Sequence, residues 1–166
     1  MVTELTVRPL RADEADLHRT LRLEALKESP RAFGDTLATL QSKRAHYWNA
    51  LTKRVCTVDV MLLALDSERA VGMIYGLHDP LIRKGARLGG IWVDAQHRRR
   101  GAGRMLVEGV IGWAQSRDYR TARLWVGQEE EAAIALYQRS GFGFTGTERP
   151  LEDRPSIVIR EMQRPL

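Results

Sequence analysis

The run Gly90-Ile91-Trp92-Val93-Asp94-Ala95-Gln96-His97-Arg98-Arg99-Arg100-Gly101-Ala102-Gly103-Arg104 joins an apolar segment to three arginines and two glycines. The apolar start predicts a buried strand, and the residues from Gly101 onward predict a helix. Glycines at 101 and 103 let a ligand approach the backbone closely, since they carry no side chain. The first amides of a helix lack partners within it and carry partial positive charge, so they suit a phosphate or diphosphate. The neighbouring arginines would add charge-assisted contacts to the same group.

Two other phosphate-binding motifs fit this run less well. The dinucleotide fingerprint G-x-G-x-x-G needs a third glycine at position 106, where Leu106 stands. The loop that holds nucleoside triphosphates needs Gly-Lys-Ser or Gly-Lys-Thr, and neither occurs in the sequence. The remaining alternative is a solvated, arginine-rich loop in front of an ordinary helix.

The segments on either side of this run alternate between strand and helix patterns. Gly89-Gly90 predicts a β-bulge or a close backbone approach, and Gly141 predicts the left-handed residue that ends a helix. We predict strands over 3–10, 55–65, 70–76, 87–93, 121–126, 142–147 and 156–162. We predict helices from Asp13 or Asp16 to Glu28, and over 37–53, 101–118 and 129–139. The early strands pair locally and the later ones alternate with helices, so the fold class is α/β with a mixed sheet.

Length and composition predict a single globular domain over residues 1–166. The 43% hydrophobic and 28% charged residues exclude a disordered or fibrous chain. Cys56 is the one cysteine, so an internal disulfide is excluded and a reducing, cytoplasmic location is expected. No apolar run is long enough for a membrane span, and Glu4 and Arg8 break any signal-peptide pattern, so no membrane association is expected.

The charge balance predicts an anionic partner. The net charge is +5, and all but four of the 26 Lys and Arg residues are arginines, which bind phosphate and carboxylate with a planar fork. Nucleic acid is not expected, because no groove-reading motif or set of stacking aromatics accompanies the arginine run. The four histidines lack paired ligand spacing, so no metal is expected either.

Two motifs together carry a family resemblance that extends over nearly the whole chain. Arg98-Arg99-Arg100-Gly101-Ala102-Gly103 resembles the acetyl-coenzyme A signature R/Q-x-x-G-x-G/A of the GNAT acetyltransferases. Downstream, Ala133-Ile134-Ala135-Leu136-Tyr137-Gln138-Arg139-Ser140-Gly141-Phe142 is similar to the family's second signature, A-I-x-L-Y-x-x-x-G-F. The resemblance implies a mixed, mostly antiparallel sheet of about six to seven strands flanked by about four helices. It also implies acetyl-coenzyme A as the acyl donor.

The resemblance assigns the cofactor-binding residues. In the family the strand before the signature parts from its neighbour, which frees backbone groups for the pantetheine arm of the cofactor, while the loop amides hold the diphosphate. The positions implied here are Ile91, Trp92, Val93, Arg98, Arg99, Arg100, Gly101, Ala102, Gly103 and Arg104. For Trp92 the alternative is simple packing in the core.

Tyr137 matches the family tyrosine that protonates the departing thiolate. A thiol has a pKa of about 8.5, so a nearby phenol can supply the proton as the carbon–sulfur bond breaks. The alternative is that Tyr137 only packs beside Ala133 and Leu136.

The chain departs from the family pattern at two places. Glu130 stands where the family often has an asparagine that contacts the pantetheine arm. Many members also carry a glutamate on the strand before the signature as general base, but this strand has no carboxylate until Asp94, which leaves the base open. A water chain, Glu130 and Asp94 all remain candidates. Direct transfer needs only a neutral amine placed against the thioester.

The resemblance places the acceptor between the first two helices and the last two strands. Phe33, Asp35 and Glu148 are the substrate-binding candidates, and carboxylates around such a cleft would favour a cationic amine unless they are simply solvated. The function implied is acetyl transfer from acetyl-coenzyme A to a primary amine of a small molecule or peptide. The alternatives are a non-catalytic acyl-coenzyme A sensor and a protein N-terminal or lysine acetyltransferase. A homodimer is also possible.

Overall fold

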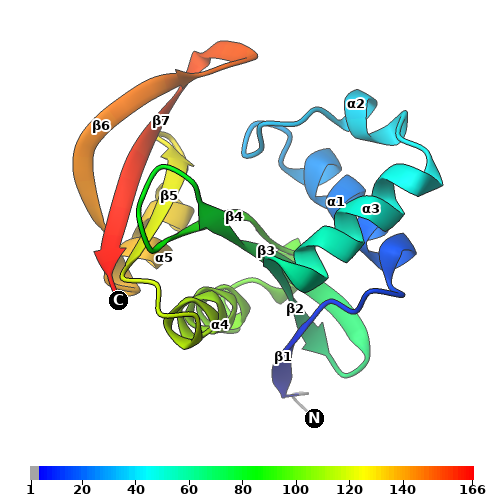
Figure 1. Ribbon diagram of the computed structural model, residues 1–166. Coiled ribbons are helices and arrows are strands. Elements are labelled where there is room, and N and C mark those ends of the chain that lie inside the picture. The colour runs from blue at the N-terminus through cyan, green and yellow to red at the C-terminus, as the bar shows by residue number, and fades with distance from the viewer. Residues whose placement is uncertain (1–3) are drawn as a thin grey trace.

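The computed structural model describes residues 4–166 and contains one seven-stranded sheet with helices on both faces (Figure 1). The strand order is β1-β2-β3-β4-β5-β7-β6, and every neighbouring pair is antiparallel except β4 with β5. The elements are β1 Leu5–Pro9, α1 Ala15–Glu28, α2 Leu37–Gln41, α3 Ala45–Thr57, β2 Val60–Asp66, β3 Arg69–Asp79, β4 Gly85–Val93, the short 3-10 helix η1 Ala95–His97, α4 Ala102–Ser116, β5 Thr121–Gly127, α5 Glu131–Arg139, β6 Gly143–Leu151 and β7 Arg154–Pro165. This confirms the predicted α/β class and the mixed, mostly antiparallel sheet.

The sheet separates two hydrophobic cores. Buried side chains of α4 and α5 pack against one face, with Leu106, Val110 and Tyr137 among them. Buried side chains of α1, α2 and α3 pack against the other face, with Leu21 and Trp48 among them. Each helix therefore buries one apolar stripe, as expected for a layered α/β domain.

The predicted bulge at Gly89-Gly90 is confirmed, and it changes which face the rest of β4 presents. Gly90 has a φ of +60°, and the register with β3 shifts between Met73 and Tyr75. Side chains alternate along a strand, so one extra residue moves the following side chains to the opposite face. As a result Trp92 packs in the α1–α3 core, while Ile91 and Val93 pack beside α4.

Strands β4 and β5 pair over a short length and then separate. Within the described residues, their parallel pairing extends from Gly85 to Arg87 on β4 and from Thr121 to Arg123 on β5. Beyond Arg87 no strand of the described chain pairs with the edge of β4 that faces β5, which opens the middle of the sheet. In Figure 1, β5, β6 and β7 swing away from the first four strands at this point.

Two predicted elements in the first half of the chain have wrong bounds. The predicted helix 37–53 is two helices, because α2 ends at Gln41 and the Ser42 hydroxyl donates to the Thr39 carbonyl. The predicted strand 55–65 begins only at Val60, since the preceding residues complete α3, with Cys56 in its last turn.

The predicted cap of α1 also differs. Neither Asp13 nor Asp16 caps α1. Glu14 occupies that position, and its carboxylate binds Arg8 and Arg11 instead of the helix amides. Thr3, the start of the predicted first strand, lies outside the described residues.

Candidate functional site

The glycine loop between β4 and α4 has the backbone geometry that a phosphate-binding turn requires. Gly101 precedes the first turn of α4 with a φ of +92°, and apart from its chain neighbours no atom of residues 4–166 lies within 4 Å of where its Cβ would be. No side chain among the described residues caps this helix start, so its first amides are available to an anion. A Cβ on Gly103 would lie 3.1 Å from a methyl group of Leu136, so this glycine lets α4 pack closely on α5.

Two of the loop arginines brace the loop. Arg98 donates from Nε to the carbonyl of Val93 at 2.9 Å and pairs with Glu28 at the end of α1 at 3.1 Å. Arg100 pairs with Asp66 at 2.9 Å. Arg99 and Arg104 are exposed, and no acidic side chain within residues 4–166 pairs with either. The structure thus leaves Arg99 and Arg104 as the arginines whose charge is available beside the loop amides.

The three predicted positions on β4 fall on two faces. The Ile91 and Val93 side chains pack toward α4, and their backbone lies on the strand edge that β5 has left. The Trp92 side chain is buried in the opposite core, where its indole N–H donates to Glu28. Glu28 therefore connects the Trp92 ring to Arg98 and fixes the loop relative to α1.

Tyr137 lies on α5 with its ring inside the core beside α4. The ring meets Phe142 edge-on at a centroid distance of 5.9 Å, and the residue is only 4% exposed. Burial raises the pKa of its phenol, so the hydroxyl stays protonated at neutral pH. Among residues 4–166 nothing hydrogen-bonds this hydroxyl.

A cavity of about 550 Å³ opens on the α1–α3 side of the gap between β4 and β5. Its apolar lining includes Phe33, Tyr47, Tyr75 and Trp125, and its charged lining consists of Arg22, Arg31, Arg54, Arg87, Asp35 and Asp59. Two of the predicted substrate residues, Phe33 and Asp35, therefore lie at this cavity. Glu148 does not line it, because that residue is exposed on β6, opposite Arg160 of β7.

A buried polar cluster supports one wall of the cavity and is absent from the sequence-based predictions. His18 is fully buried and hydrogen-bonds the Tyr75 hydroxyl at 2.5 Å and Thr52 at 2.8 Å. Burial, aided by the charge of Arg22, lowers the pKa of His18 from an ordinary 6.5 to about 4. Helical spacing could have predicted the burial of His18, because His18 precedes the buried Leu21 by three residues and Ala25 by seven.

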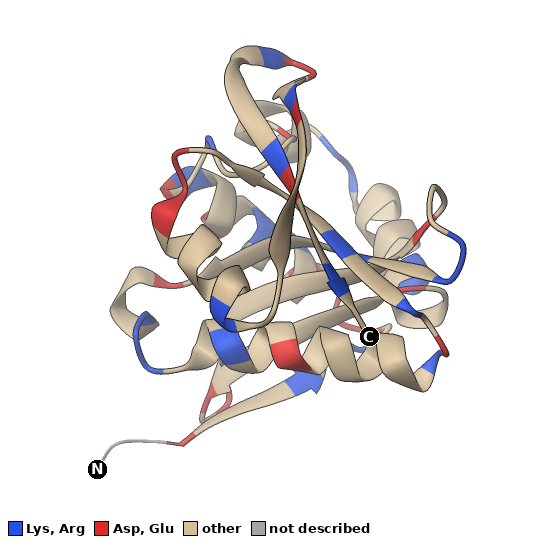
Figure 2. Cartoon of the chain, turned by 90° about the vertical axis from the view of Figure 1, so that its left-hand side faces the viewer, with Lys and Arg blue, Asp and Glu red and all other residues tan. Residues whose placement is uncertain are grey.

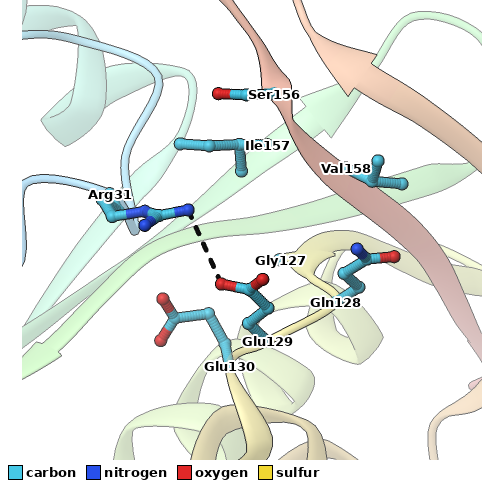
Figure 3. A pocket seen from close by; sticks show the side chains of 8 residues that line it. All are labelled: Arg31, Gly127, Gln128, Glu129, Glu130, Ser156, Ile157 and Val158. Carbon is cyan, nitrogen blue, oxygen red and sulfur yellow. Dashed lines mark ion pairs between the residues drawn. The ribbon is translucent and has the colours of Figure 1, made fainter.

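A much smaller pocket adjoins the cavity where β5 leads into α5 (Figure 3). The two share Arg31 and Gly127, and Figure 3 shows Arg31 paired with Glu129, at 3.6 Å, above the side chain of Glu130. Glu130 is thus near the rim of the cavity. Asp94, the other carboxylate considered as a base, accepts from the Gln96 amide and pairs with Arg69.

Comparison with known proteins identifies the family. The acetyltransferase (GNAT) family matches residues 21–142, which is most of the chain. The chain belongs to the GNAT acetyltransferase family. Human N-acetyltransferase 8 is 38% identical over 87 residues, 51% of this chain, but the chain spans only 38% of that protein's length.

Solved structures share the GNAT fold along almost the full chain. A GNAT-family acetyltransferase from Streptococcus pneumoniae superposes with a TM-score of 0.80 at 22% identity, covering 98% of this chain and all of that one. The putative acetyltransferase yncA of Salmonella typhimurium, solved with its cofactor acetyl-CoA, has the same TM-score at 15% identity, covering 99% and 95% of the two chains. The fold that these structures share therefore extends beyond residues 21–142, the part matched by the GNAT family.

The described residues also bear on metal and membrane binding. Within residues 4–166, no group of three or more His, Cys, Asp or Glu side chains is arranged to hold a metal ion. None of the helices formed by these residues has the length and apolarity that crossing a membrane requires. Figure 2 shows basic and acidic positions interspersed over the helices and strands it displays.

Proposed function

We propose that this protein transfers an acetyl group from acetyl-coenzyme A to a primary amine. The observation that carries the proposal is the gap between β4 and β5, which has the glycine loop on one side and the 550 Å³ cavity on the other. Such a gap lets two substrates meet at one strand edge from opposite faces of the sheet. Both cores and the sheet draw on elements from Leu5 to Leu166, which supports the predicted single domain.

The residues present fit a coenzyme A thioester. The free β4 edge at Ile91 and Val93 offers backbone groups to the pantetheine arm, and the amides at the start of α4 suit the diphosphate. Arg99 and Arg104 add positive charge beside those amides. When bound, acetyl-coenzyme A supplies an acyl carbon activated by its thiol leaving group. The structural relative from Salmonella typhimurium, which was solved with acetyl-CoA, supports this choice of donor.

The reaction needs two proton movements. The neutral amine nitrogen attacks the thioester carbonyl carbon, the carbon–sulfur bond breaks, and the nitrogen loses one proton while the sulfur gains one. Tyr137 is the proposed donor to sulfur, since its phenol carries a proton at neutral pH that it can give to the thiolate as the carbon–sulfur bond breaks. The base is either Glu130 near the cavity rim or a water chain. Asp94 is less suited, because its carboxylate is already bound to Arg69 and the Gln96 amide.

The Tyr137→Phe variant tests the assignment. We expect kcat to fall about 100-fold or more with little change in KM for acetyl-coenzyme A, which is the usual contribution of a positioned acid. Thermal stability should not change, because no described residue bonds the hydroxyl that is removed. Thiol release from acetyl-coenzyme A gives the rate.

Tyr119→Phe is the matched control, since Tyr119 lies near His78 and Trp113 and does not line the cavity. An unchanged kcat in Tyr137→Phe would show that Tyr137 only packs in the core. Tight donor binding without turnover of any amine would instead favour the acyl-coenzyme A sensor.

A further inference from the structure

Arg22 is held at the bulge of β4 with one nitrogen unused. Its Nη2 donates to Asp35 at 2.9 Å, and its guanidinium lies over the rings of Phe33 and Tyr75 at 4.8 and 5.7 Å from their centroids. Its Nη1 is buried, and no group within residues 4–166 accepts a hydrogen bond from it. A buried donor without a partner is costly, so an acceptor group that reached this atom would be bound favourably.

The unpartnered Nη1 of Arg22 lies beside the strand edge at which the proposed acetyl transfer takes place. A Cβ built on Gly90 would lie 3.4 Å from Arg22 Nη1, so this nitrogen is beside the bulge from which β4 runs to Ile91. In the proposed function the free edge beyond that bulge binds the thioester arm. A group bound to Nη1 would therefore be adjacent to the reacting amine.

The charge of the cavity favours an anionic group there. Both of its aspartates are already paired with arginines of the same lining, Asp35 with Arg22 and Asp59 with Arg54. Arg87 also lines the cavity, and no acidic side chain in the described chain pairs with it. Of the carboxylates that suggested a cationic acceptor, Asp35 is thus paired and Glu148 lies outside the cavity, so positive charge remains in excess in the lining.

We propose that the acceptor is an α-amino acid with an apolar or aromatic side chain, whose carboxylate binds Arg22. This rests on the proposed acetyl transfer and names its substrate class. An α-amino group is one carbon away from its carboxylate, which matches an anion site directly beside the reaction centre. The aromatic walls formed by Phe33, Tyr47 and Trp125 would hold the side chain. Asp35 and the two rings fix the guanidinium in advance, so little entropy is lost when the carboxylate binds.

A matched pair of acceptors tests the proposal. We would measure kcat/KM at pH 8 for acetylation of L-phenylalanine and of L-phenylalaninamide, which differ by the negative charge. We expect the acid to be preferred, although the amide has the less basic amine and so more of the reactive neutral form. Arg22→Gln should lower kcat/KM for the acid by about 10- to 100-fold and hardly change it for the amide, as expected for loss of a charge-assisted bond.

Controls separate binding from folding. The ratio of the two kcat/KM values within one preparation does not depend on the folded fraction. Partial unfolding of Arg22→Gln would therefore leave this ratio unchanged. Arg19→Gln, an exposed change on the same helix, should leave the ratio unchanged. Arg22→Lys keeps the charge without the fork and should restore part of the preference.

Three results would overturn the proposal. Equal use of acid and amide after correction for the fraction of neutral amine, an equal loss for both in Arg22→Gln, or a preference for spermidine would each reject the amino acid while leaving acetyl transfer intact. Failure to acetylate any of these amines despite donor binding would reject the proposed function as well.

Discussion

At the scale of residues, the hydrogen bonds that hold one wall of the cavity require a neutral His18. His18 accepts or donates one hydrogen bond on each ring nitrogen, to Tyr75 and to Thr52, inside a core that contains the charge of Arg22. Burial raises the pKa of Tyr75 to about 12, so its hydroxyl also stays neutral at physiological pH. The cluster therefore positions the Tyr75 ring against Gly90 without adding an anion that would compete for Arg22.

The lowered pKa of His18 predicts a loss of stability in mild acid. Below its ordinary pKa of 6.5 the unfolded chain takes up a proton at His18 that the folded chain refuses until about pH 4. The contribution of neutral His18 to the free energy of unfolding should thus be complete well above pH 6.5. The free energy of unfolding should fall by about 3 kcal/mol as the pH drops from there to 4. Urea denaturation across this range measures the loss.

His18→Gln provides the comparison for that experiment. Glutamine does not titrate, so the variant should be less stable at pH 7 but should lose less between pH 6.5 and 4. A wild-type stability that stays constant over this range would contradict the buried neutral histidine.

At the scale of elements, the sequence predicted the features that depend on neighbouring residues, such as turns and helix ends. Gly90 and Gly141 both have positive φ, as their positions in a strand and after a helix indicated. The end of α3 was missed because Val55, Thr57 and Val58 favour a strand locally, whereas burial of Val55 beside Trp48 stabilises the helix. A short apolar run in the sequence does not predict such tertiary contacts.

A buried ion network fixes the strands where the sheet is still continuous. Arg123 on β5 binds both oxygens of Asp79 on β3, at 2.6 and 2.9 Å, and also Glu161 on β7 at 3.1 Å. All three residues are buried, and Thr145 of β6 donates to the same glutamate. The network therefore ties strands from both halves of the sheet beside the short β4–β5 ladder.

Removing the central arginine should be strongly destabilising. Arg123→Met leaves two buried carboxylates without their partner, and breaking such a pair costs about 3–5 kcal/mol. The free energy of unfolding from urea denaturation measures the effect. Asp79→Asn with Glu161→Gln in the same variant should recover part of the loss, because neutral amides replace the unpaired charges. No recovery would mean that the methionine packs badly and that charge is not the cause.

For the molecule as a whole, the site is a product of topology that single motifs do not reveal. The glycine loop and Tyr137 were recognisable because each belongs to a continuous signature. The cavity combines Arg22 of α1, Tyr75 of β3 and Trp125 of β5, which only the folded sheet brings together. Because these three residues lie far apart in the sequence, the sequence indicated an amine acceptor near Phe33 and Asp35 but did not indicate Arg22, which contacts both of them.

The same topology predicts that the donor stabilises the entire fold. The two halves of the sheet are joined by the ladder of Gly85–Arg87 with Thr121–Arg123 and by the Arg123 network, so a ligand bound in the gap adds a further connection. At 100 times its Kd, coenzyme A should stabilise the folded state by about 2.7 kcal/mol and raise Tm by about 5–10 °C for a chain of this size. Differential scanning calorimetry measures the shift, and hydrogen exchange locates it. Amides on β4 beyond Arg87 and at the start of α4 should be protected together. Protection confined to α4 would mean that the diphosphate alone is held and that the gap takes no part in donor binding.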